Sequence, residues 1–251
     1  MFDLTWDGWA ILAIASLLIG LSKTALPGVG TIAVALFAFV LPAKMSTAAI
    51  LVLLLCADLI AIYTYRRDAD WKILRALFPT VLAGIITGAI FLFFANDIVM
   101  KRSIGVILLG LVAITLFSKM RSRQEQDRTS AKVTTNPFIR GFYGALGGFT
   151  TMAANAGGPV MSLYFLAARF DVTRFLGTSA WFFFIVNLTK LPFSAGLGLI
   201  SSSSLLTNLA LLPFVLIGAF GGRSLAKRMS NKVFDPIVLV LTIVSSVALL
   251  F

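Results

Sequence analysis

Two lysines stand inside stretches of this chain that otherwise lack charge, Lys23 in GLSKTALPGVG and Lys190 in VNLTKLPF. A third ionisable side chain, Asp58, lies within the equally apolar stretch LVLLLCADLIAIY. Ionisable groups are expensive to bury in such surroundings, so each is a candidate for function by default. An ammonium group among apolar residues can hold an anion, and a desolvated carboxylate can carry a proton. The sequence therefore predicts anion binding at the lysines and proton coupling at Asp58.

Each of these residues also has a purely structural interpretation. Lys23 and Asp58 could form a buried ion pair that serves only packing. Lys190 lies late in its apolar segment and could extend to the lipid headgroups. Asn155, in the sequence NAGGP, could do no more than cap the helix that follows it. These alternatives stay open at the level of sequence.

Several classes of chemistry lack the residues they need. The chain has no His, and its ten acidic residues are scattered, which disfavours His-based acid–base catalysis and zinc sites with His ligands. No G-x-x-x-x-G-K-[ST] motif for ATP is present. Ser22 and Lys23 are adjacent and so do not face each other on a helix, which makes a membrane-embedded transferase a weak alternative. We expect no enzyme, no cofactor and no metal.

The composition is that of a membrane protein. Of 251 residues, 59% are hydrophobic and 12% are charged, and the mean hydropathy is +0.98. Soluble domains are about half apolar and a quarter charged. Because a membrane-spanning helix needs roughly 20 apolar residues, the long uncharged runs predict an all-α polytopic membrane protein. The expected helical segments are 8–26, 28–41, 45–65, 74–95, 99–118, 138–154, 157–169, 174–194, 204–226 and 233–251.

The basic residues predict the topology. When loops alternate from an external N-terminus, sixteen basic residues fall on one side: Arg66, Arg67, Lys72, Arg75, Lys119, Arg121, Arg123, Arg128, Lys132, Arg140, Arg169, Arg174, Arg223, Lys227, Arg228 and Lys232. The other side receives Lys44, Lys101 and Arg102. The positive-inside rule makes the first side cytoplasmic and places both termini outside. The net charge of +11 is then a topology signal and a contact with lipid headgroups, which argues against a nucleic-acid partner.

The chain reads as two related halves. LFPTVLAGIITG (77–88) and LLPFVLIGAFGG (211–222) agree at six of twelve positions, including a GxxxG pair in each. A polar stretch between the halves predicts three units: a first transmembrane repeat at 1–118, a cytoplasmic linker at 119–137 and a second repeat at 138–251. Since each half holds five segments, an odd number, the second repeat enters the membrane from the opposite side, as in many secondary transporters.

Two helix breaks recur at corresponding places in these halves. PGVG (27–30) corresponds to AGGP (156–159), and Asp58 corresponds to Asn187 at the same offset of about 129 residues. Unwound backbone at membrane depth is tolerated only where it is buried in protein or lines a water-filled cavity. Each break joins either two full spans or the arms of a re-entrant hairpin, and we favour hairpins or half-spans whose tips approach the midplane. Free N–H groups and helix dipoles at such tips suit an anion.

The stretches GLSKTALPGVGTIAVALFAFVLP and GALGGFTTMAANAGGPVMSLYFL resemble the TauE/SafE sulfite and organosulfonate exporters, a family of bacterial permeases. The resemblance covers nearly the whole chain. It implies a bacterial inner-membrane protein that moves small sulfur-containing anions such as sulfite, sulfoacetate, sulfolactate or thiosulfate. It also implies a substrate path along the two motifs. Together with the polar residues near the breaks, the candidate substrate-binding residues are Ser22, Lys23, Thr24, Gly28, Gly30, Thr151, Asn155, Gly157, Gly158, Asn187 and Lys190.

The function we expect is secondary transport of such anions by alternating access, with a passive anion channel as the alternative. The partners we expect are a small anionic substrate and the lipid bilayer, with a homodimer left open as the assembly. Asp58 is the only acidic residue deep in an expected span, so it is the candidate for proton coupling.

Overall fold

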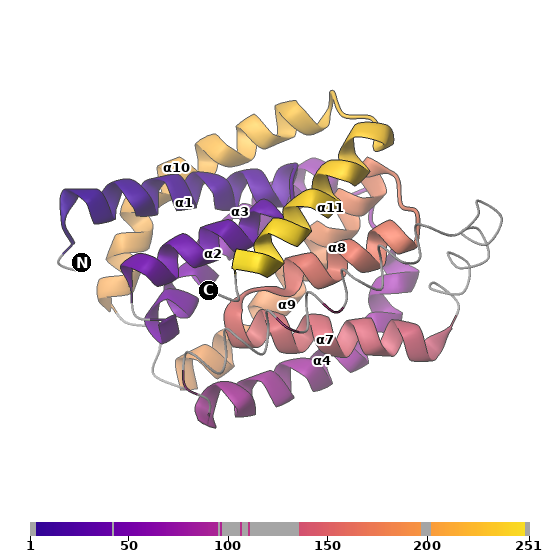
Figure 1. Cartoon of the computed structure of the whole chain (residues 1–251), viewed down its shortest axis with the longest axis horizontal. Coiled ribbons are helices and arrows are strands. Elements are labelled where there is room, and N and C mark those ends of the chain that lie inside the picture. The colour runs from indigo at the N-terminus through magenta and orange to yellow at the C-terminus, as the bar shows by residue number, and fades with distance from the viewer. Residues whose placement is uncertain are drawn as a thin grey trace.

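Every regular element that the structure describes is an α-helix (Figure 1). The structure is a computed structural model that describes residues 4–41, 43–94, 96, 106, 110, 136–196 and 202–248. The helices are α1 (Trp6–Thr24), α2 (Val29–Val40), α3 (Ala43–Tyr65), α4 (Trp71–Phe94), α7 (Pro137–Ala154), α8 (Gly157–Ala167), α9 (Val172–Gly196), α10 (Ser202–Ala226) and α11 (Asn231–Ala248). The predicted all-α class is confirmed, with each of these helices within three residues of an expected segment. The expected helix at 99–118 and most of the linker at 119–137 lie outside the described residues.

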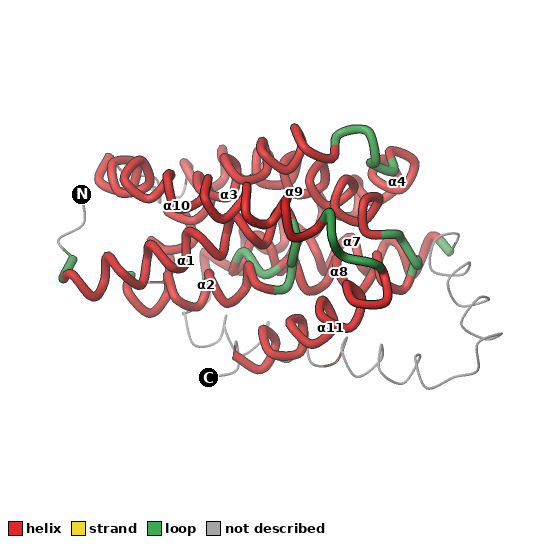
Figure 2. Tube along the Cα trace, turned by 90° about the horizontal axis from the view of Figure 1, so that it is seen from above, coloured by secondary structure: helices red, strands yellow, loops and turns green. Residues whose placement is uncertain are grey.

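The helices have the properties of a membrane protein. Figure 2 shows that they run roughly along one common direction. Three of the described helices, α1, α4 and α10, are long and apolar enough to cross a bilayer. Large apolar side chains also stand on the outer surface: Phe39 is 81% exposed and Phe94 is 80% exposed. Exposed apolar surface on this scale is unfavourable in water and is expected where a surface meets lipid.

Both predicted helix breaks are present. Helix α1 ends at Thr24, where the carbonyl of Leu21 accepts from the N–H groups of both Ala25 and Leu26, at 2.9 and 3.2 Å. Helix α7 ends where Asn155 adopts the left-handed conformation, with φ of 52°, which Asn tolerates better than most residues. Helix α2 has 12 residues and α8 has 11, so each is below about 20 Å long, too short to cross a hydrocarbon core of about 30 Å.

The tips of the two breaks lie against each other. A side chain built on Gly158 would approach the carbonyl oxygen of Pro27 to 3.4 Å, and α2 and α8 are in contact. Thus the stretches PGVG and AGGP, which correspond in sequence, also adjoin in space. Helices α2 and α8, which follow the two breaks, begin at these adjoining tips and run away from them.

Each half of the chain packs one of its helices along a helix of the other half. Helix α1 packs along α10 and helix α7 packs along α4, as Figure 1 shows at its upper and lower edges. Both pairs approach closely at glycines. A Cβ on Gly218 would lie 2.0 Å from the carbonyl oxygen of Leu17, and a Cβ on Gly84 would lie 2.1 Å from that of Ala145. The GxxxG glycines of the two similar stretches therefore occupy equivalent helix crossings.

An ion pair and a hydrogen bond join the segment before α4 to the start of α9. Arg174, at the start of α9, forms an ion pair with Asp70, just before α4, and the backbone N–H of Asp70 donates to Thr178 Oγ1 at 3.0 Å. Partial burial opposes ionisation of Asp70. Hydrogen bonds from Arg174 and from the N–H of Ile73 outweigh it and hold the pKa of this carboxyl below its usual value. The pair therefore stays ionised at neutral pH and ties the first half to the second.

Candidate functional site

Lys23 and Asp58 form an ion pair inside the molecule. Lys23 stands in the last turn of α1 and Asp58 in the second half of α3, and its Nζ lies 2.7 Å from Asp58 Oδ1. Asp58 is fully buried, whereas the Lys23 side chain remains 10% exposed. The same ammonium lies 4.3 Å from the centre of the Phe183 ring, a favourable cation–π distance. The ion pair that we weighed as an alternative is thus formed.

Asn187 connects this pair to the second lysine. Its Nδ2 donates to Asp58 Oδ2 at 2.7 Å, and its Oδ1 accepts from Lys190 Nζ at 3.5 Å. Asp58 and Asn187, which correspond in the two halves of the sequence, are therefore bonded to each other where α3 crosses α9. Both the nitrogen and the oxygen of the Asn187 side-chain amide are therefore hydrogen-bonded.

Lys190 is buried, with 1% of its surface exposed, so the alternative in which it extends to the headgroups is wrong. Its ammonium donates to Asn155 Oδ1, and it lies 3.5 Å from Thr151 Oγ1. These partners stand at the end of α7, beside the second break. Asn155 therefore holds Lys190 through its side chain, and it is more than a cap for the helix that follows.

With both lysines and Asp58 ionised, the network carries one unbalanced positive charge. Within the described residues it contains two ammonium groups, of Lys23 and Lys190, and one carboxylate, of Asp58, so one positive charge remains after subtraction. Lys190 meets only neutral oxygen atoms among its hydrogen-bond partners. An unbalanced buried charge is costly, and the cost is relieved either by loss of a proton from Lys190 or by arrival of an anion. The site as a whole therefore favours an anion.

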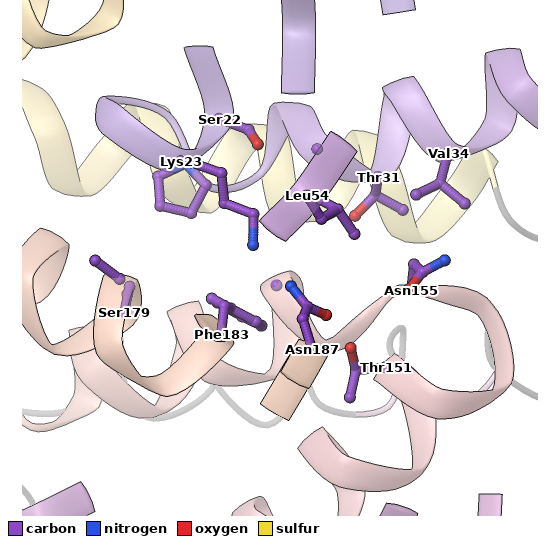
Figure 3. A pocket seen from close by; sticks show the side chains of 14 residues that line it. Ser22, Lys23, Thr31, Val34, Leu54, Thr151, Asn155, Ser179, Phe183 and Asn187 are labelled. Carbon is purple, nitrogen blue, oxygen red and sulfur yellow. The ribbon is translucent and has the colours of Figure 1, made fainter. Parts of the chain in front are cut away.

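A small cavity opens between the two halves beside this network. Figure 3 shows side chains from α1, α2 and α3 facing others from α7 and α9 across it. Its volume is about 40 Å³, far below the roughly 300 Å³ or more of pockets for drug-sized ligands. Seven of the expected binding residues line it: Ser22, Lys23, Gly30, Thr151, Asn155, Gly158 and Asn187.

The other expected binding residues do not line the cavity. Thr24 is buried between helices, where its Oγ1 donates to the carbonyl of Ala219 in α10 at 2.9 Å. Gly28 packs on α11, since a Cβ there would lie 2.4 Å from Leu241. Gly157 lies against Thr151 and the carbonyl of Gly147 in α7. Lys190 and Asp58 do not line the cavity themselves. They bond to residues that do, as described above.

The two helix tips differ in the donors they offer. At the first tip the N–H of Val29 bonds to Leu26 at 2.9 Å and the N–H of Gly30 bonds to Pro27 at 3.4 Å, so these amides are already occupied. At the second tip, within the described part of the chain, no acceptor is bonded to the N–H of Gly158, which lines the cavity. Of these three amides, that of Gly158 is the one without a backbone acceptor among the described residues.

Seven of the residues that line the cavity were absent from the sequence-based prediction, and Phe183, Thr31 and Ser179 are three of them. Phe183 precedes Asn187 by four residues and so lies on the same face of α9, a spacing that could have identified it. Thr31 directly follows the motif PGVG and is 3% exposed. Ser179 belongs to no motif, and only the packing of α9 brings it to the cavity.

A family model described as Sulfite exporter TauE/SafE matches residues 12–249 of the chain. The match covers both helix breaks and the whole charged network. No curated protein and no solved structure matches the chain significantly.

Proposed function

Because the chain belongs to the TauE/SafE sulfite exporter family, we propose that it exports small sulfur-containing anions as a secondary transporter of the bacterial inner membrane. The observation that carries the proposal is a small cavity beside two buried ammonium groups and a single carboxylate. The surplus positive charge favours an anion, and the size of the cavity favours a small one. A tetrahedral or pyramidal oxyanion such as sulfite meets both requirements better than a longer organosulfonate.

We assign the recognition of the anion to donors that face the cavity. The ammonium of Lys23 supplies the charge. The hydroxyl of Thr151 and the N–H of Gly158 stand around the same space, as does the hydroxyl of Ser22, which donates to the carbonyl of Ile19 at 2.9 Å and must turn from it to reach the anion. Because Lys190 bonds to oxygen atoms of Thr151 and Asn155, those acceptors are occupied and the hydroxyl proton of Thr151 can turn to the cavity. Lysine binds oxyanions less directionally than arginine, which suits a protein that must release its ligand.

Asp58 couples the anion to a proton in this proposal. Its carboxylate already occupies Lys23 at 2.7 Å, so an incoming anion competes with it for the same ammonium. A proton on Asp58 removes the competitor and leaves Lys23 for the substrate. The loaded site is then exposed alternately to the two sides of the membrane by movement of two inverted halves.

A binding panel tests the proposal. Purified protein is titrated with sulfite, thiosulfate, methanesulfonate and sulfoacetate, with zwitterionic taurine and potassium ions as controls, and heat of binding is measured. We expect sulfite and thiosulfate to bind most tightly and the controls not to bind. Equal binding of taurine and sulfite would refute an anion site. In proteoliposomes, a flux that saturates with concentration would separate this carrier from a passive channel.

A further inference from the structure

An apolar groove runs along the lipid-facing surface between α4 and α9, away from the charged network. Its volume is about 330 Å³, within the range of about 300–1,000 Å³ that ligand pockets have. Leu74, Phe182 and Val186 are buried and form its floor, while Phe78 is 38% exposed at its rim. The groove is therefore a preformed apolar channel on a surface that faces lipid.

One residue that lines the groove interrupts the backbone hydrogen bonding of α4. Pro79 lies inside this helix and lines the groove. It lacks the N–H that would bond to the carbonyl of Arg75, and prolines at such positions kink helices. Helix α4 touches α9 only lightly, whereas α10, which contains the similar stretch 211–222, packs closely along α3. The similar stretch in α10 carries Pro213 at the position of Pro79, so the proline is shared and the gap follows from the looser packing of α4 on α9.

One end of the groove is charged and aromatic. Arg75 lines it and is exposed, and among the described residues no carboxylate lies within ion-pair distance of its guanidinium. Trp71 lines the same end one turn earlier, with its ring centre 5.0 Å from that of Trp181. Tryptophan and arginine next to an apolar stretch mark the headgroup level of a bilayer. Residues 66–75 hold four basic side chains against two acidic ones, Asp68 and Asp70, so this end is basic on balance.

We infer that this groove binds an anionic phospholipid, with an acyl chain along its apolar floor and the phosphate on Arg75. The apolar lining accounts for the chain and the unpaired guanidinium accounts for the negative headgroup. The basic end belongs to the side on which most basic loop residues fall, so the lipid comes from the leaflet at that side. This lipid site is independent of the anion cavity and of the proposed transport.

Tryptophan fluorescence tests the inference directly. Trp6 and Trp9, at the other end of α1, are replaced by phenylalanine, which leaves Trp71 and Trp181 to report on the groove. The full chain is reconstituted in phosphatidylcholine vesicles that contain phosphatidylglycerol with brominated acyl chains, because bromine quenches indole fluorescence on contact. Each basic residue near a membrane surface contributes about 1 kcal/mol of attraction to anionic lipid, so we expect roughly a fivefold preference for phosphatidylglycerol over phosphatidylcholine.

Two variants locate the effect. Arg75→Gln should reduce the preference to about onefold while brominated phosphatidylcholine still quenches, which shows that the groove is intact. Arg66→Gln removes the same charge from an arginine that lies over Tyr63 rather than in the groove, and it should leave the preference unchanged. If both variants lose the preference for phosphatidylglycerol equally, the preference comes from general surface charge and the inference is overturned. Absence of quenching by either brominated lipid would also overturn it, since another part of the chain or a second copy would then cover the groove.

Discussion

Lys23 and Lys190 differ in what stands beside their ammonium groups. Lys23 has a carboxylate as partner, so its charge is balanced whenever Asp58 is ionised. Among the described residues, Lys190 has amide and hydroxyl oxygens as its partners and no carboxylate. Breaking a buried ion pair by removing one partner costs about 3–5 kcal/mol, because the other charge is left uncompensated. A simple Lys23→Ala variant would therefore confound loss of binding with loss of the fold.

A charge-balanced double variant reduces that problem, because Asp58→Asn alone leaves Lys23 without its partner whereas the double variant removes both charges of the pair. Asp58→Asn removes the competitor for Lys23, and we expect it to bind sulfite at least as tightly as the parent protein. Lys23→Met combined with Asp58→Asn removes both charges and keeps the volume, and we expect its affinity to fall at least tenfold. Calorimetric titration measures both affinities, and thermal unfolding verifies the fold. If the double variant binds sulfite normally, Lys23 has no role in binding.

The same residue predicts how binding responds to pH. If a proton on Asp58 releases Lys23, affinity for an anion of fixed charge must rise as the pH falls. Methanesulfonate is the suitable probe, because its own charge does not change near neutral pH. We expect its affinity for the parent protein to increase toward pH 5 and its affinity for Asp58→Asn to be independent of pH. A variant that keeps the parental pH response would dismiss Asp58 as the proton carrier.

At the scale of the helices, glycine contacts hold the exchanged pairs together. The backbone of α10 touches that of α1 at Gly218, where any Cβ would lie 2.0 Å from a carbonyl oxygen of α1. Gly221, three residues later in the same helix, has no neighbouring atom within 4 Å of such a Cβ. These two glycines therefore share a helix and differ in environment, which makes one a control for the other.

We expect Gly218→Ala to destabilise the protein by about 1–3 kcal/mol, since the backbones must separate to admit the methyl group. Gly221→Ala should be neutral, or stabilising by up to about 1 kcal/mol, because alanine favours a helix. Thermal or denaturant unfolding in detergent measures the difference. Equal effects of the two substitutions would contradict the close crossing of α1 and α10.

At the scale of the whole molecule, the prediction that remains is the orientation in the membrane. We expect the linker at 119–137 in the cytoplasm and both termini outside, from the distribution of basic residues. Replacing Cys56 by Ser removes the chain's single cysteine, after which Ser130→Cys and Leu4→Cys can be introduced one at a time. A membrane-impermeant thiol reagent should label the residue-4 variant in intact cells and the residue-130 variant only after the cells are opened. The reverse pattern would invert the topology.

Hydropathy and residue type were enough to predict the helices that the structure describes and both breaks. A helix needs a continuous apolar run and ends where Pro, Gly or a left-handed Asn interrupts it, and these are local properties that α1, α2, α7 and α8 display in sequence. The three ionisable residues of the network were likewise visible as charges in apolar runs. Because burying an ionisable group in apolar surroundings is costly, these residues were conspicuous in the sequence.

Only the tertiary structure decided which of these groups meet. The bond from Asn187 to Asp58 joins residues 129 positions apart, and it exists because α3 and α9 cross at those side chains. The same packing turned Thr24 toward α10 and Gly28 toward α11, and it brought Phe183 to the ammonium of Lys23. Local periodicity states which face of a helix is apolar or polar. The partner of that face depends on how whole helices pack, and here close contacts at glycines determine that packing.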